Sequence, residues 1–242
     1  MERNILFFCN NDPSIGLRVR RPVAGPEDHL LNCFIEKKTH DKRNKSDLAI
    51  FVEPEILSGY PDLVIAKYDV GKYCGWNDER LKLRNIDIKI LYYMLICNHV
   101  TSSQCCAQLG MTKGALLDCL ENLLDAKLIA RKNFEWVVSQ GVTDNLLISE
   151  LISVEAKINN WKKVFEQASI NMHFANSSYV LTPTKKPSDG IQAHARNIGI
   201  GIYSCSDQKV TRIVTPHRKR GVMSYTSLLF NEWLGRRIYT RG

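Results

Sequence analysis

The chain has 242 residues, of which 44% are hydrophobic and 24% are charged, a composition typical of a globular protein with one large domain or two small ones. No apolar run approaches the length of about 18 residues that a membrane span needs, and the apolar run near the N-terminus is too short for a secretory signal. The eight cysteines form no Cys-x-x-Cys pair and lack a histidine spacing suited to zinc. We therefore expect a cytoplasmic protein with free thiols and no membrane association.

The net charge of +8 is concentrated in the last quarter of the chain. Residues 183–242 carry eleven lysines and arginines against three acids, whereas residues 1–182 carry 22 of each sign. Such clustering suits a polyanion, most often nucleic acid, although a solvated basic tail is the alternative. The candidate nucleic-acid contacts in this region are Lys185, Lys186, Arg212, Arg218, Lys219 and Arg220.

The first 70 residues predict a strand, a helix and a hairpin. The strand covers residues 4–8, and the helix begins at Pro26 with acids in its first turn and runs to about Lys38. Residues 48–68 read as two strands joined by the turn Ser58–Pro61, and Asp62 opens the second strand.

Residues 86–138 predict a small helical unit. Three helices are expected, the second ended by Gly110 and the third capped by Thr112, followed by a hairpin with Lys132 and Asn133 as its turn. This order resembles the winged helix-turn-helix family over about 55 residues. Lys113 is a candidate DNA contact, but the exposed side of helix 112–127 is nearly neutral in charge, so contact with a protein partner is the alternative.

The remaining chain returns to alternating strands and helices. We expect a strand at 146–158, a helix at 159–175 and strands at 177–183, 198–206 and 209–217, the last two joined by the turn Ser206-Asp207-Gln208. A final helix is predicted at 224–238. This succession indicates a mixed α/β sheet.

One predicted strand carries an acid and a base in an apolar run, "LISVEAK". Alternate side chains of a strand point the same way, so Ser153, Glu155 and Lys157 are expected on one side. Buried charges are unfavourable unless they are paired or used. A same-face salt bridge at a strand end is the simple explanation of Glu155 and Lys157.

With residues 70–142 set aside, Pro61-Asp62 before one strand and Glu155-Ala156-Lys157 at the end of the next resemble the PD-(D/E)xK nuclease superfamily. The resemblance implies a restriction-endonuclease-like α/β fold, a mixed sheet flanked by helices. It makes residues 1–69 and 143–242 one discontinuous domain and residues 70–142 an inserted winged-helix domain. Asp62 and Glu155 are 93 residues apart, farther than the superfamily's usual single hairpin, and the insertion accounts for the difference only if its ends lie close together.

The resemblance also implies a site. Asp62, Glu155 and the backbone carbonyl of Ala156 would hold Mg²⁺ or Mn²⁺, with Glu27 as a further acid from the first helix. Glu36 and Glu53 compete with Glu27 for that place. Lys157 would position the attacking water or stabilise the developing charge, and Gln167 matches a helical position found in several branches of the superfamily.

The function expected from this resemblance is that of a metal-dependent endonuclease acting on double-stranded DNA, within a restriction, defence or mobile-element system. A homodimer would suit cleavage of both strands. The alternatives are a non-enzymatic DNA-binding regulator, or an inactive nuclease-fold subunit of a larger complex. A regulator does not require Asp62, Glu155 and Lys157 to converge.

Overall fold

A computed structural model describes residues 3–41, 45–73, 76–206, 209–221 and 223–240. The chain forms two compact units, one built from the described parts of 1–68 and 148–223, the other from those of 69–147 and 224–242. None of the helices within these described ranges is long and apolar enough to cross a membrane.

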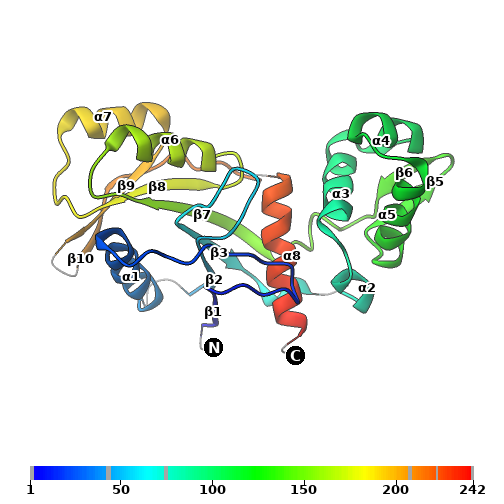
Figure 1. Cartoon of the computed structure of the whole chain (residues 1–242), viewed down its shortest axis with the longest axis horizontal. Helices are drawn as coiled ribbons and strands as arrows, with labels where there is room; N and C mark the ends of the chain where they lie inside the picture. The colour runs from blue at the N-terminus through cyan, green and yellow to red at the C-terminus, as the bar shows by residue number, and fades with distance from the viewer. Residues whose placement is uncertain (1–2, 42–44, 74–75, 207–208, 222, 241–242) are drawn as a thin grey trace. The chain divides into compact units, whose positions relative to one another are not determined.

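The first unit is built on a seven-stranded sheet with the order β1-β2-β3-β7-β8-β9-β10 (Figure 1). Its strands are β1 (Ile5–Phe8), β2 (Asp47–Val52), β3 (Leu63–Tyr68), β7 (Ile148–Ala156), β8 (Ser177–Thr182), β9 (Gly201–Ser206) and β10 (Lys209–Val214). The pairs β1–β2, β7–β8 and β8–β9 are parallel, and the other neighbours are antiparallel. The expectation of a mixed α/β sheet is confirmed, and so is the predicted hairpin of β2 and β3. The predicted turn after Ser206 includes Asp207 and Gln208, which lie outside the described residues.

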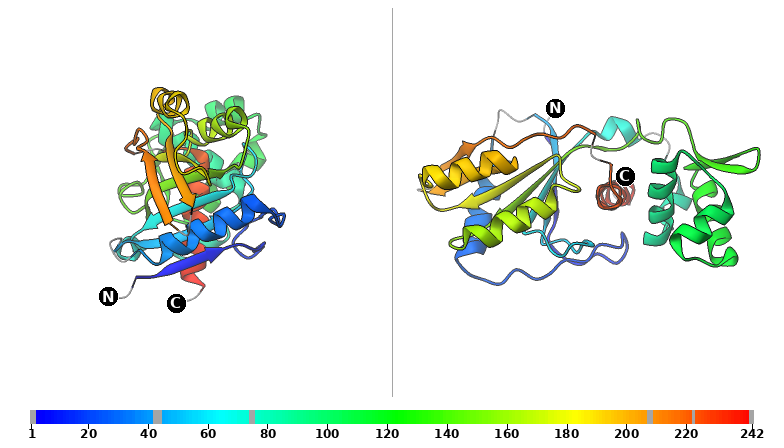
Figure 2. Two further views of the ribbon diagram at one scale, coloured as in Figure 1. Left: turned by 90° about the vertical axis from the view of Figure 1, so that its left-hand side faces the viewer. Right: turned by 90° about the horizontal axis from the view of Figure 1, so that it is seen from above.

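Helices cover both faces of this sheet. α1 (Pro26–Thr39) lies on one face, and α6 (Trp161–Asn171) and α7 (Asp189–Ile198) lie on the other (Figure 2). The alternation along β7 follows from this arrangement, because Val154 and Ala156 join the core beneath α1 while the odd-numbered side chains face α6. The sequence did not predict α7, which buries only Ala195 fully among its ten residues.

The second unit contains helices and a small sheet. Its elements are the short helix η1 (Val70–Tyr73), α2 (Asp78–Leu81), α3 (Asn85–Cys97), β4 (His99–Val100), α4 (Ser102–Leu109), α5 (Lys113–Asp125), β5 (Ile129–Lys132), β6 (Glu135–Val138) and α8 (Tyr225–Tyr239). The three strands pair in the order β4-β6-β5. As predicted, Gly110 ends α4 in a left-handed conformation (φ 64°) and the Thr112 side chain caps α5. The hairpin turn falls at Asn133 and Phe134, one residue later than expected.

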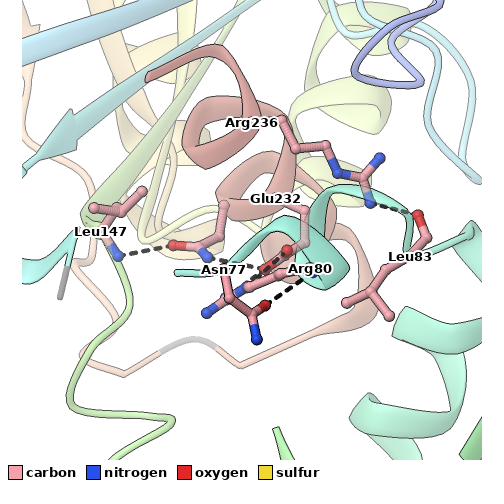
Figure 3. A network of polar contacts seen from close by, with 7 residues as sticks. Asn77, Arg80, Leu83, Leu147, Glu232 and Arg236 are labelled. Atoms are coloured by element: carbon pink, nitrogen blue, oxygen red, sulfur yellow. Dashed lines mark hydrogen bonds and ion pairs between the residues drawn. The ribbon is translucent and has the colours of Figure 1, made fainter. Parts of the chain in front are cut away.

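The C-terminal helix belongs to this second unit, whereas the sequence assigned it to the nuclease-like domain. The Arg80 guanidinium donates to both carboxylate oxygens of Glu232 at 2.7 and 3.1 Å, and Arg236 donates to the Leu83 carbonyl at 2.5 Å. Figure 3 shows these contacts. Trp76 packs so closely on Gly235 that a Cβ there would lie 2.0 Å from the indole. Buried charges of α8 thus find their partners in α2 and its flanking residues, and this pairing was not visible in the hydrophobic pattern.

Candidate functional site

Two carboxylates meet at one end of the seven-stranded sheet. β3 and β7 are antiparallel neighbours, with Leu63 opposite Val154, so one further step of the same register sets Asp62 opposite Glu155. Directly opposed like charges destabilise a sheet. The chain between these strands, residues 69–147, lies in the other compact unit, and the separation of 93 residues therefore does not keep the two acids apart.

Glu155 is buried and incompletely satisfied. The residue is 2% exposed, and its Oε1 accepts a hydrogen bond of 2.6 Å from Asn171 Nδ2. Its Oε2 is also buried and receives no hydrogen bond from any described residue. A buried acceptor without a donor is unfavourable by about 1–3 kcal/mol, and by more when it is charged. Glu155 therefore occupies a position that only a cation, a proton or a new donor would relieve.

The pKa values of both acids are raised above their usual values. Burial raises the pKa of Glu155 well above its usual value, and the neighbouring charge of Asp62 raises it further, against the opposing hydrogen bond from Asn171. Burial likewise raises the pKa of Asp62, and the charge of Glu53 adds to this effect. Two neighbouring carboxyls with raised pKa values are a common feature of metal and acid–base sites, where a cation or a shared proton compensates the repulsion.

Asp62 also fixes the end of β7. Its Oδ2 accepts a hydrogen bond of 2.8 Å from the backbone N–H of Ala156. The N–H and C=O of one residue in a strand point to the same side, so the carbonyl of Ala156 is directed toward Asp62 as well. This orientation is the one that the predicted backbone ligand requires.

Lys157 lies one residue beyond the end of β7, not within the strand as expected. Its backbone N–H still bonds the Leu181 carbonyl at 2.9 Å, but its Nζ contacts the Glu27 carboxylate of α1 at 2.7 Å. Lys157 is near enough to Asp62 for its charge to lower the pKa of that carboxyl, while the charge of Glu27 raises it. The structure therefore gathers Glu27, Asp62, Glu155 and Lys157 at one end of the sheet.

The two other acids considered for the place of Glu27 differ in position. Glu36 is exposed and lies nine residues farther along α1, which is roughly 13 Å from Glu27. Glu53 is buried in a left-handed conformation (φ 46°) and pairs with the Arg20 guanidinium. Its backbone N–H bonds the Asp62 carbonyl at 3.1 Å, so Glu53 belongs to the surroundings of the carboxyl pair.

The helical residue that reaches the site is Asn171 rather than the predicted Gln167. Gln167 lies half-buried on α6 and forms no hydrogen bond to Asp62, Glu155 or Lys157. Asn171, one turn later, is 4% exposed. It continues the buried stripe of Val164 and Ala168, and a polar residue in such an apolar stripe is the sequence signal that identifies it.

The predicted nucleic-acid contacts are not collected at the carboxyl pair. Lys185 and Lys186 are exposed after β8, Arg220 is exposed near the end of the first unit, and Lys113 begins α5 in the second unit. Lys219 donates to the Met172 carbonyl at 3.3 Å. Arg212 and Arg218 line a cavity near the beginning of β7.

The carboxyl pair fits a hard cation, because carboxylate and carbonyl oxygens are the ligands that Mg²⁺ and Mn²⁺ prefer and because Glu155 Oε2 is buried without a donor. Glu27 does not complete a three-acid set, since its carboxylate is bonded to Lys157. Within the described ranges, no three His, Cys, Asp or Glu side chains are arranged to hold a metal.

Comparisons of the chain with protein-family models, with curated proteins and with solved structures gave no match.

Proposed function

We propose that the protein is a metal-dependent endonuclease that hydrolyses phosphodiester bonds in DNA, with a restriction-endonuclease-like first unit. The observation that carries the proposal is the buried pair of Asp62 and Glu155, in which Glu155 Oε2 has no donor among the described residues. A purely structural strand end gains nothing from two opposed, buried carboxyls whose pKa values are both raised. Active sites commonly contain such destabilising arrangements.

Asp62, Glu155 and the Ala156 carbonyl are the residues that would hold Mg²⁺ or Mn²⁺. The bound cation would supply charge neutralisation at the scissile phosphate and lower the pKa of a water molecule. Asn171 holds one oxygen of Glu155 at 2.6 Å and thereby orients the other. Asp62 is held by the Ala156 N–H, so both carboxyls have fixed positions before any ligand arrives.

Lys157 is a cation that is accessible to the substrate at this end of the sheet. Its side chain is 27% exposed and bonded to Glu27, whose side chain is 40% exposed. A pair this accessible to water is weakly held. Lys157 can therefore exchange Glu27 for a substrate phosphate, and Glu27 positions Lys157 in the meantime.

The second unit supports a proposal of its own, that of a winged-helix module engaged in protein contact. Three helices and a three-stranded sheet are in the order that such a module has. Leu117 and Leu124 on α5 are 56% and 44% exposed, and Phe134 at the hairpin tip is 86% exposed. Exposed apolar side chains on a nearly neutral helix favour a protein surface over DNA phosphates.

The proposed activity is tested by incubating the purified protein with supercoiled and linear DNA in Mg²⁺ or Mn²⁺, beside Glu155→Ala and Lys157→Ala. We expect the parent to cut and both variants to fail. Glu166→Gln, which changes an exposed acid on α6, is the matched control and should cut like the parent.

Two results contradict the proposal. Retained cutting in both variants would place the activity elsewhere or in a contaminant. Absence of cutting by the parent, with DNA bound and all variants folded, would favour the regulator or an inactive subunit instead.

A further inference from the structure

A second charged site lies in the first unit, on the opposite face of the sheet from Glu155. It is a cavity of about 290 Å³ beneath the C-terminal half of α1, at the small end of the range for ligand pockets. Its charged and aromatic lining comprises Phe34, Lys38, Lys67, Glu150, Tyr179, Tyr203, Arg212 and Arg218. Glu150 and Glu155 are five residues apart on β7, which separates the two sites by roughly 17 Å along the strand.

The cavity has an excess of positive charge. Four cations line it, and Glu150 is the one acid among its lining residues. Glu150 is 6% exposed, and its two oxygens contact Lys67 at 2.7 Å and Arg218 at 3.1 Å. One carboxylate thus pairs with two cations, Lys67 and Arg218, and neither Lys38 nor Arg212 forms an ion pair with it.

Lys38 lies among aromatic rings rather than beside an acid of the cavity. Its Nζ donates to the Tyr203 hydroxyl at 3.1 Å and lies 4.3 Å from the centre of the same ring. Burial lowers the pKa of Lys38, and the charges of Arg212 and Lys67 lower it further, against the effects of Tyr179 and Asp41. An anion bound in the cavity would reverse that shift.

The ring faces of the two tyrosines are already occupied. Tyr179 and Tyr203 stack on each other with centroids 4.4 Å apart. A Cβ at Gly201 would lie 2.4 Å from the Tyr179 ring, and Lys38 covers Tyr203. A planar ligand therefore has no free face to stack on here. The tyrosine hydroxyls form a polar cluster with two of the cations, because Tyr203 accepts from Lys38 and Tyr179 interacts with Tyr203 and Arg212. The site consequently favours a compact oxyanion over an aromatic ring.

We propose that this cavity binds a phosphate group of a small phosphorylated molecule, held by Lys38, Arg212 and the hydroxyls of Tyr179 and Tyr203. Charged donors and hydroxyls converging on one pocket are the usual means of phosphate recognition. An adjoining depression of about 550 Å³, lined by Lys37, Asp41 and Lys209 among others, gives room for the remainder of the molecule. None of these residues belongs to the carboxyl site, so the inference does not depend on nuclease activity.

The test is calorimetric titration of the full chain with inorganic phosphate and with adenosine 5′-monophosphate at low ionic strength. Arg212→Gln and Lys38→Met should each weaken binding by about tenfold. Arg196→Gln is the matched control, because Arg196 is exposed on α7 and bonds Gln192, and it should bind like the parent. Glu150→Gln should bind more tightly, since it removes the negative charge and frees Lys67 and Arg218. Circular dichroism verifies that each variant is folded.

The two ligands and a short DNA duplex distinguish the sources of the phosphate. Tighter binding of the nucleotide than of inorganic phosphate would identify a phosphate monoester, and the reverse order would identify a free oxyanion. The proposal is overturned if neither ligand binds at millimolar concentration, if Arg196→Gln loses as much affinity as Arg212→Gln, or if Glu150→Gln binds more weakly. It is also overturned if Arg212→Gln weakens binding of the DNA duplex alone and inorganic phosphate does not compete with the duplex for binding.

Discussion

Glu150 and Glu155 are two buried glutamates of the same strand, and their surroundings are opposite. Glu150 has a cation within 3.1 Å of each oxygen, whereas Glu155 faces Asp62 and leaves Oε2 without a donor from the described residues. The comparison shows how a satisfied buried acid differs from an unsatisfied one. The strand pattern alone does not distinguish them, because both are acids in an apolar run.

The largest effect should come from Glu155→Gln. We expect DNA cleavage to fall by about a thousandfold or more, while the free energy of unfolding at neutral pH rises by about 1 kcal/mol, because the repulsion with Asp62 is removed. Cleavage rates and urea denaturation measure the two effects. Loss of both activity and stability would mean that Glu155 is a structural acid like Glu150.

A smaller effect on cleavage distinguishes two positions of α6. Asn171→Ala removes the donor to Glu155 Oε1 and should reduce cleavage by about tenfold, the equivalent of one hydrogen bond of roughly 1.4 kcal/mol. Gln167→Ala should change cleavage by much less. Equal losses of cleavage in the two variants would show that Gln167 contributes to the site as much as Asn171 does.

Removing the charge of Glu150, the acid that is paired with two cations, should lower the stability of the fold. Glu150→Gln breaks two ion pairs, but Lys67 and Arg218 are partly exposed and can be hydrated instead. We expect the free energy of unfolding to fall by about 1 kcal/mol, measured in urea beside Glu155→Gln. A gain in stability would remove the contrast between the two glutamates.

The pH dependence of stability should differ between the parent protein and Glu155→Gln. A carboxyl whose pKa is raised by folding binds a proton more tightly in the folded state, so its contribution to stability is fully present at low pH and is lost as pH rises. The window for Glu155 opens at its usual value of 4.5 and extends through the raised pKa. Over that window the parent should lose stability with rising pH relative to Glu155→Gln. A parallel course of the two curves would contradict the raised pKa.

The smallest effect is expected at one exposed lysine of the consecutive pair Lys185 and Lys186. Lys186→Gln should weaken DNA binding by about twofold to threefold at moderate salt and reduce the slope of log affinity against log salt by about 0.9, as expected for one phosphate contact. Fluorescence anisotropy at several salt concentrations measures both. An unchanged slope would assign Lys186 to the solvated surface.

The sequence predicted most of the sheet because its strands are short apolar runs bounded by turn residues, as in the hairpin of β2 and β3. It also selected Asp62 and Glu155, which the register of β3 and β7 brings together. It did not find Asn171 or α7, where the signal is a polar residue in an apolar stripe or a helix with one fully buried side chain. The cavity around Lys38 could not be predicted, since its residues come from α1, six strands (β2, β3, β7, β8, β9 and β10) and the segment that follows β10, and meet only in the folded chain.

The most direct measurement of the carboxyl site is a calorimetric titration of the parent, Glu155→Gln and Glu150→Gln with Mn²⁺. We expect the parent and Glu150→Gln to bind one ion with similar affinity, and Glu155→Gln to bind it at least about tenfold more weakly. Equal binding by all three proteins, or no binding by the parent, would contradict a metal site at Asp62 and Glu155.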